Sequence, residues 1–254
     1  MQLPVNRFKH AILAGRRQIG LWSSLGSPTA MEMLAHSGFD WFVLDTEHAP
    51  NELPDVIAQM RVLANSPAEA VVRPAWNDMV LIKRFLDAGA QTLLVPFIQN
   101  ADEARQAVRS MRYPPDGVRG VSVAQRANRY GRVADYHARA QDELCLLVQL
   151  ETRSALDQLE AIAEVDGVDG IFIGPSDLAA DLGHLGNPAH PEVQDAIRSA
   201  VERCRAVGKP AGILTPVEEE ARRYLDWGFT FVAVGSEMGL LRKAADALAA
   251  RFTQ

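Results

Sequence analysis

Cysteine and lysine are both scarce in this sequence, and each shortage disfavours a kind of chemistry. The only two cysteines among 254 residues are Cys145 and Cys204, and their spacing matches no zinc motif. We expect two buried thiols in a reducing compartment rather than a disulfide. The four lysines are Lys9, Lys83, Lys209 and Lys243. None of them is expected at the carboxyl end of a strand, which disfavours a Schiff-base mechanism.

Positive charge and long apolar runs are also in short supply. The net charge of −6 argues against general binding of nucleic acid, which requires a basic surface. No apolar run approaches the ~18 residues that cross a bilayer, and the first residues lack the apolar core of a signal peptide. We therefore expect a cytoplasmic protein that binds neither nucleic acid nor membranes. A hydrophobic content of 48% is ample for a large core.

One pattern occurs four times, at Gly38, Gly89, Gly167 and Gly228. In each case an apolar run follows the glycine, and a polar residue, glycine or proline stands seven positions after it. Glycine commonly ends a helix, and a continuous apolar run is typical of a strand buried on both faces. Further strands are predicted near residues 18–23, 69–73, 144–149 and 210–214.

Eight strands that alternate with helices over about 250 residues predict an α/β fold, a single (β/α)8 TIM barrel spanning residues 1–254. The alternative is an open, doubly wound sheet. Such a sheet usually carries a glycine-rich loop after its first strand, and the stretch WSSLG at 22–26 is not one. The pattern therefore favours the barrel.

Residues 111–142 interrupt the alternation with a long connection rich in arginine, glycine and proline. Such a connection is either a functional segment or a solvated loop, and the sequence does not decide between them. Arg119 and Arg126 are candidates to bind a second carboxylate of a substrate.

Two carboxylates follow predicted strands and suggest a metal site. Glu151 comes just after the fifth strand and Asp177 just after the sixth. Each alone is readily explained as a charge or a cap at a helix start. Because the carboxyl ends of barrel strands meet at one face, the two together predict a site for Mg²⁺ or Mn²⁺.

The second and third strands end in groups suited to acid–base and anion chemistry. Asp45 and His48 are interpreted as an orienting acid and a general base, with Glu47 supporting a water. Arg73, at the end of a buried strand, needs an anion such as an enolate or a carboxylate. The backbone of the turn at 174–177 is a further candidate for holding a carboxylate.

A divalent metal, a base and an arginine together suit carbanion chemistry next to a carbonyl. The metal would chelate a 2-oxo acid and the base would move the proton of a neighbouring hydroxyl. The predicted reaction is a reversible aldol cleavage.

The ordered motifs FDWFVLDTEHAPN, VVRPAWND, TLLVPFIQNADEAR, RYPPDGVRG, LVQLETRSA, VDGIFIGPSDLAADLG and FVAVGSEM resemble the metal-dependent 4-hydroxy-2-oxoheptane-1,7-dioate aldolase family. The resemblance runs from about residue 5 to 252. It implies a class II aldolase that binds pyruvate on Mg²⁺, Mn²⁺ or Co²⁺ held by Glu151 and Asp177. It also implies that Arg73 stabilises the enolate while His48, with Asp45, handles the proton. The substrate-binding residues that it implies are Trp22, Gln149, Gly174, Pro175 and Ser176.

The same resemblance implies a role in the catabolism of aromatic or sugar acids. It also implies a hexamer, a trimer of dimers that exchange C-terminal helices, and residues 239–251 are apolar enough to pack on a neighbour. Two alternatives stay open. One is a related barrel that cleaves CoA thioesters, and the other is a barrel that binds a keto acid without catalysis. The sequence does not specify the aldehyde.

Overall fold

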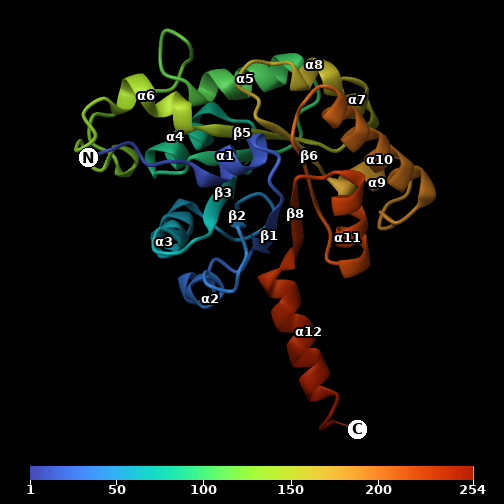
Figure 1. The fold of residues 1–254 in the computed structure, drawn as a ribbon. Helices are drawn as coiled ribbons and strands as arrows, with labels where there is room; N and C mark the ends of the chain where they lie inside the picture. Colours follow the sequence, from blue (N-terminus) through green and yellow to red (C-terminus); the bar gives the residue numbers. More distant parts are fainter. Residues whose placement is uncertain (254) are drawn as a thin grey trace.

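The computed structural model describes residues 1–253, and its eight parallel strands close into a barrel in chain order with helices around it (Figure 1). The strands are β1 (Gln18–Ser23), β2 (Trp41–Asp45), β3 (Glu69–Arg73), β4 (Thr92–Val95), β5 (Cys145–Leu150), β6 (Gly170–Ile173), β7 (Ala211–Leu214) and β8 (Phe231–Ser236). The helices are α1 (Arg7–Leu13), α2 (Pro28–Leu34), α3 (Leu53–Leu63), α4 (Met79–Asp87), α5 (Ala101–Met111), the 3₁₀ helix η1 (Arg126–Asn128), α6 (Tyr136–Glu143), α7 (Arg153–Asp157), α8 (Leu159–Ala163), α9 (Pro175–Asp181), α10 (Pro191–Ala206), α11 (Glu218–Trp227) and α12 (Glu237–Ala249).

The predicted barrel is confirmed, and the glycine pattern has the expected cause. Gly38, Gly89, Gly167 and Gly228 all have positive φ, between 96° and 110°. This left-handed conformation lets the chain leave a helix and turn into the next strand. The open-sheet alternative is wrong, because β1 pairs in parallel with β8 and thereby removes both sheet edges.

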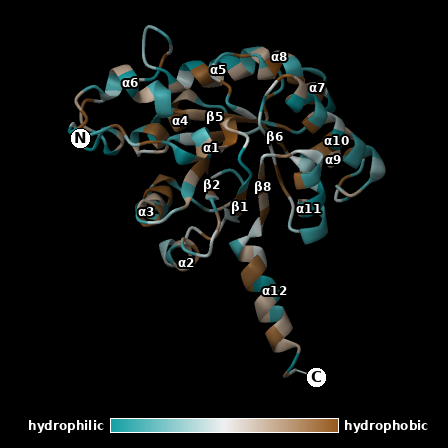
Figure 2. Ribbon diagram, viewed as in Figure 1, coloured by the Kyte–Doolittle hydropathy of each residue, from teal (hydrophilic) through white to brown (hydrophobic). Residues whose placement is uncertain are grey.

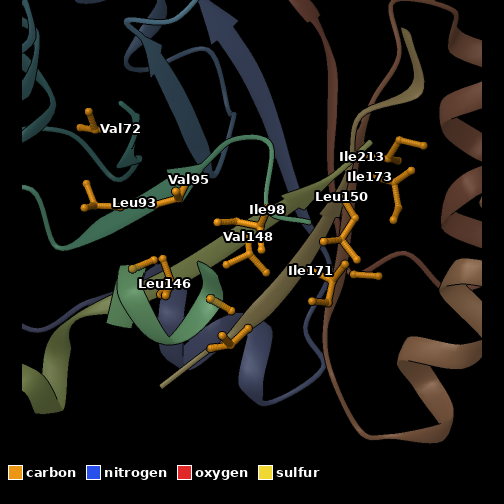
Figure 3. Close-up of a cluster of buried hydrophobic side chains, with 14 of the residues drawn as sticks. Val72, Leu93, Val95, Ile98, Leu146, Val148, Leu150, Ile171, Ile173 and Ile213 are labelled. Carbon is orange, nitrogen blue, oxygen red and sulfur yellow. The ribbon is translucent and has the colours of Figure 1, made fainter. Parts of the chain in front are cut away.

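The strands separate two layers of apolar side chains. On β2, Trp41 and Val43 belong to the cluster inside the barrel, whereas Phe42 and Leu44 belong to the larger cluster between strands and helices. Figure 3 shows part of the outer cluster, with side chains of β3, β4, β5, β6 and β7. Successive side chains of a strand point to opposite faces, so every second residue faces the interior of the barrel. The same alternation positions the side chains of the site described below.

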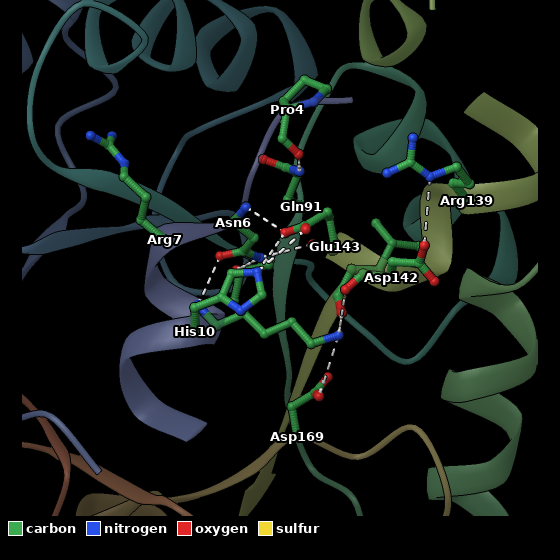
Figure 4. A network of polar contacts seen from close by, with 12 residues as sticks. Pro4, Asn6, Arg7, His10, Gln91, Arg139, Asp142, Glu143 and Asp169 are labelled. Carbon is green, nitrogen blue, oxygen red and sulfur yellow. Dashed lines mark hydrogen bonds and ion pairs between the residues drawn. The ribbon is translucent and has the colours of Figure 1, made fainter. Parts of the chain in front are cut away.

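Helix α1 closes the amino-terminal end of the barrel. The ring of Phe8 lies 5.4 Å from that of Trp41 and 5.6 Å from that of Phe231, measured between centroids. A polar network surrounds this helix (Figure 4). In it, the side-chain amide of Asn6 donates to Thr92 Oγ1 at 2.9 Å, and its backbone N–H donates to Glu143 Oε2 at 2.7 Å. With this end filled, the opposite end is left for a ligand.

The long connection at 111–142 contains η1 and α6, and its two candidate arginines serve the fold. Arg119 is fully buried, with its guanidinium 4.5 Å from the ring of Tyr113 and 2.8 Å from Asp87 Oδ1. Arg126 donates to the carbonyl of Ala88 at 2.8 Å, in the loop that leads into β4. Neither arginine reaches the carboxyl end of its own barrel, so the predicted contact with a substrate carboxylate is not formed within the subunit.

The last helix, α12, leaves the barrel and projects away from the other elements (Figure 1). Apolar residues recur along it (Figure 2), and Leu240 and Leu241 are 49% and 62% exposed. The sequence predicted this helix at 239–251, two residues later than it is found. Within residues 1–253, no helix combines the length and the apolar character that a bilayer crossing requires.

Candidate active site

The candidate site lies at the carboxyl end of the barrel. The alternation of side chains along each strand determines which of them point into the site. Val43, Val71 and Leu147 point into the barrel. Two residues further along the same strands stand Asp45, Arg73 and Gln149, which this alternation turns toward the same axis. All three are at most 6% exposed, so these polar groups are buried at the barrel mouth rather than spread over the surface.

Arg73 and Asp45 form the central ion pair. Nε of Arg73 donates to Asp45 Oδ1 at 2.9 Å, and Nη2 donates to Oδ2 at 2.7 Å. This two-point contact fixes both planar groups. Trp22 completes the arrangement, because its Nε1 donates to Asp45 Oδ2 at 3.2 Å and its ring lies 5.1 Å from the guanidinium carbon. Strands β1, β2 and β3 are therefore joined by one polar cluster.

Asp45 remains ionised despite its burial. Burial by itself raises the pKa of Asp45, but the hydrogen bonds and the charge of Arg73 outweigh it, and the pKa falls below its ordinary value. The backbone N–H of Glu47 and the indole of Trp22 add to the lowering. A permanently charged Asp45 keeps the guanidinium of Arg73 in one orientation.

The predicted pairing of Asp45 with the imidazole of His48 is wrong for this structure. Both oxygens of Asp45 bind Arg73, and only the backbone N–H of His48 approaches Asp45, at 3.4 Å. The imidazole is 65% exposed and faces Glu47 instead, with 3.9 Å between His48 Nε2 and Glu47 Oε1. The physical reason is that a guanidinium matches a carboxylate at two points, which an imidazole cannot do.

Glu47 connects the two catalytic candidates. Its Oε2 lies 2.7 Å from Nη1 of Arg73, and its Oε1 faces His48. Burial raises the pKa of Glu47, the charges of Arg73 and His48 oppose the rise, and the charges of Asp45 and Asp177 add to it. The net pKa is above its ordinary value, so Glu47 exchanges a proton more readily near neutral pH than Asp45 does.

Glu151 is a buried carboxylate that no cationic side chain within residues 1–253 pairs with. Its Oε1 accepts from the backbone N–H of Phe97 at 3.0 Å, and its Oε2 accepts from Gln149 Nε2 at 2.5 Å. Burial raises the pKa of Glu151 to about 7; the Gln149 bond opposes this rise, and the negative charges of Asp177 and Glu47 add to it. The negative charges of Asp177 and Glu47 disfavour the ionisation of Glu151, and a bound cation would offset this repulsion.

The donor set at this place fits a divalent cation. Glu151 supplies hard oxygen ligands, Asp177 stands in the first turn of α9, and the side-chain oxygen of Gln149 is buried without a hydrogen-bond partner in the described part of the chain. Carboxylate and amide oxygens, with room for water, are the ligands that Mg²⁺ and Mn²⁺ prefer. The two residues predicted from sequence as metal ligands lie near enough for the charge of Asp177 to raise the pKa of Glu151, and their role as ligands stays a prediction.

Gly174 is required for this arrangement, since a methyl group there would lie 2.3 Å from Glu151 Oε2 and 3.0 Å from Gln149 Nε2. We expect Gly174→Ala to displace the Glu151 carboxylate and to weaken Mn²⁺ binding at least tenfold. Isothermal titration calorimetry measures the affinity, and thermal denaturation confirms folding. An unchanged Mn²⁺ affinity would show that Glu151 is not a ligand.

Pro175 and Ser176 follow Gly174 at the start of α9, and Ser176 is exposed. Their position at the end of β6 agrees with the predicted place for a substrate carboxylate.

Three residues of the site were missed by the sequence reasoning. Phe97 adopts a left-handed φ of 54°, stacks on Trp76 at 5.7 Å and aims its N–H at Glu151. Asn51 donates to the carbonyl of Asp45 at 2.7 Å and holds the end of β2. Glu237 is buried, and its Oε1 accepts from the backbone N–H groups of Ser24 and Leu25 at 2.5 and 2.7 Å. The position of Glu237 directly after β8 was the only signal available for it.

The closed parallel barrel and the buried carboxylates at its carboxyl end are typical of an enzyme active site, and such carboxylates suit metal-assisted chemistry. Residues 18–244 match the family model described as HpcH/HpaI aldolase/citrate lyase. The chain belongs to this family. Aldolases of this family generally depend on a divalent metal.

Full-length relatives agree with this assignment. The chain is 58% identical over 249 residues to a 4-hydroxy-2-oxo-heptane-1,7-dioate aldolase of Klebsiella pneumoniae, covering 98% of this chain and 94% of the relative. It is 56% identical over 252 residues to a pyruvate aldolase of Rhizobium etli, covering 99% of each. A crystal structure of a family member from Burkholderia cenocepacia superimposes with a TM-score of 0.95 at 39% identity, covering 98% of this chain and 100% of the other.

Proposed function

We propose that this protein is a class II pyruvate aldolase whose single domain, residues 1–254, cleaves 4-hydroxy-2-oxo acids reversibly into pyruvate and an aldehyde. The observation that carries the proposal is the buried Glu151, with a raised pKa and with Asp177 and Glu47 close enough to influence it. The names of the relatives at 56–58% identity support the same activity. The two free cysteines, both buried, agree with the cytoplasmic compartment expected from the sequence.

Glu151 and Asp177 would hold the cation, for which Mg²⁺, Mn²⁺ and Co²⁺ are the candidates. When bound, such a cation acts as a Lewis acid toward the 2-oxo group of the substrate. Gln149 and Trp22 line the space beside it, and the backbone N–H groups of Ser176 and Asp177, the free donors of the turn at 174–177, bind the substrate carboxylate.

Arg73 and His48 carry the charge and the proton in this proposal. The guanidinium of Arg73, held by Asp45 and Glu47, presents positive charge where the enolate oxygen develops. The exposed imidazole of His48 takes the proton of the 4-hydroxyl group as the carbon–carbon bond breaks, and protonation of the resulting enolate at C3 then gives pyruvate and restores the neutral imidazole. Glu47 is the nearest acidic neighbour of His48. Because Arg73 is already fixed, no side chain must reorganise as the charge forms.

The first test is release of pyruvate from 4-hydroxy-2-oxo acids, coupled to lactate dehydrogenase. Chelator-treated protein is assayed before and after addition of Mg²⁺, Mn²⁺ or Co²⁺. We expect activity only with metal. Folded protein that stays inactive with every metal would instead favour the two alternatives, cleavage of CoA thioesters or binding of a keto acid without catalysis. A panel of aldehydes, run in the condensation direction, then identifies the natural substrate and its place in aromatic- or sugar-acid catabolism.

We expect His48→Gln to lower kcat about 10²- to 10⁴-fold, the range for loss of a general acid–base group. Because His48 contacts no metal-ligand candidate directly, Mn²⁺ affinity should stay within about twofold of the wild type. His36→Gln, at an exposed histidine after α2, is the matched control. Comparable kcat values for the two variants would remove His48 from the proton transfer.

We further propose that α12 packs on a second copy of the chain, within a hexamer built as a trimer of dimers. The exposed Leu240 and Leu241 on a helix that leaves its own barrel support this assembly. We expect Leu241→Glu to reduce the molecular mass measured by light scattering to that of a smaller assembly. Lys243→Glu, on the same exposed helix, is the control and should leave the mass unchanged. A wild-type mass for Leu241→Glu would contradict the exchange of this helix.

A further inference from the structure

A second group of metal-ligating side chains lies in the loop between α9 and α10 and at the start of α10. His184 stands in the loop after α9, His190 caps α10, and Glu192 lies in its first turn. The two imidazole rings stack with 3.5 Å between centroids, and His184 Nε2 lies 2.9 Å from Glu192 Oε2. One ligand atom from each of the three residues lies within 4.8 Å of the others.

Backbone hydrogen bonds hold this loop in place. The N–H of His184 donates to the carbonyl of Ala179 at 2.7 Å, which ties the loop to α9. Asn187 then donates to His184 at 2.9 Å, and His190 donates to Asn187 at 3.1 Å, each through backbone groups. The two imidazoles are therefore brought together by the fold and need little reordering to share a ligand.

Two side chains hold the carboxylate of Glu192 in place. Arg153 Nη2 binds its Oε1 at 2.6 Å and leaves Oε2 facing His184. A divalent cation would bind between His184 and Glu192 in place of the hydrogen bond that joins them.

We propose that His184, His190 and Glu192 form a second metal site, for a transition-metal ion such as Zn²⁺, Co²⁺ or Ni²⁺. Two imidazoles and one carboxylate, with water in the fourth position, are a common ligand set for Zn²⁺. In a tetrahedral zinc site two ligand atoms lie ~3.3 Å apart, only slightly more than the 2.9 Å between His184 and Glu192. Mg²⁺ prefers oxygen ligands and is not expected here.

The two proposed sites predict different stoichiometries for different ions. Zn²⁺ and Co²⁺ should bind twice per chain, once at the barrel mouth and once at the loop, whereas Mg²⁺ should bind once. The loop site joins the end of α9 to the start of α10. An ion there would stabilise the segment that follows the turn at 174–177.

The test is a set of Zn²⁺ titrations by calorimetry on four full-length proteins: the wild type, His184→Ala, Glu151→Gln and the double variant. We expect two ions bound by the wild type, one by each single variant and none by the double variant. His36→Ala, at an exposed histidine, should bind as the wild type does. Visible d–d absorption of Co²⁺ in Glu151→Gln, lost in the double variant, would identify nitrogen ligation at the loop.

Equal Zn²⁺ stoichiometry and affinity in the wild type and in His184→Ala would overturn the loop site. The three side chains would then serve only as a helix cap and an ion pair. The titration involves no turnover and separates this result from failure of the aldolase proposal. If the barrel-mouth metal site is absent but the loop site exists, the wild type and Glu151→Gln each bind one ion and His184→Ala binds none.

Discussion

Replacement of Arg73 by lysine is expected to lower kcat for pyruvate release about 10²- to 10³-fold at saturating metal, the usual cost of losing one preorganised donor to a developing oxyanion. Lysine keeps the positive charge but cannot bind both oxygens of Asp45 while also reaching Glu47. The ammonium group of the lysine would therefore lie away from the position of the guanidinium, and it would have to move as the enolate charge develops. Steady-state kinetics with the coupled assay measures the loss.

Arg222→Lys is the matched control for this experiment. Arg222 lies on α11 and pairs with Glu218 on an exposed helix face, so the same substitution there should leave kcat unchanged. Thermal denaturation of both variants separates a catalytic loss from a folding defect. If the Arg73 variant turns over at the wild-type rate, the guanidinium has no role in charge stabilisation.

The substitution Glu151→Gln is expected to remove the response of activity to added metal. Glutamine keeps the shape of the side chain but replaces a charged ligand by a neutral one, and the remaining carboxylate of Asp177 would bind a divalent ion weakly. Pyruvate release should fall to the level of chelator-treated wild type at every metal concentration tested. Glu164→Gln, at an exposed glutamate after α8, should behave as the wild type does.

The same variant has a second expected effect, on the stability of the metal-free protein. The pKa of Glu151 rises from 4.5 in the unfolded chain to about 7 in the folded one. The folded state thus holds the extra proton between these pH values, and the free energy of unfolding falls as the pH rises through this window. The loss is on the order of 3 kcal/mol, at about 1.4 kcal/mol for each pKa unit.

We therefore expect Glu151→Gln to be more stable than the wild type at pH 8 in chelator, and close to it at pH 4.5. Thermal denaturation of the two proteins across this range gives the comparison. Titrating groups that do not interact with Glu151 are common to both proteins, so their contributions cancel in the difference. An identical pH dependence of stability in the two proteins would show that folding does not raise the pKa of Glu151.

Much of the fold could be predicted because glycine and apolar runs act locally. Gly38, Gly89, Gly167 and Gly228 end helices for a backbone reason that needs no knowledge of tertiary contacts. Strand order then followed from the right-handed alternation of strand and helix. The convergence of Asp45, Arg73 and Glu151 could be anticipated, since parallel strands end on one face.

The partners within the site could not be predicted. Asp45 had both a histidine and an arginine within reach, and the choice depends on geometry at the ångström scale between two strands. The left-handed backbone of Phe97 has no sequence signal, because glycine or asparagine is the usual residue there. Arg119 was a candidate from sequence to bind a second substrate carboxylate, but it is enclosed by Tyr113 and Asp87.

Glu237, the first residue of α12, ties this helix to the segment that follows β1. The rest of α12 projects beyond the barrel, whereas the carboxylate of Glu237 accepts hydrogen bonds from the N–H groups of Ser24 and Leu25. Those groups follow Trp22, whose indole steadies Asp45. The first residue of α12 is thus anchored beside the rim of the barrel, so a surface that holds this helix is connected to the barrel mouth through a single carboxylate.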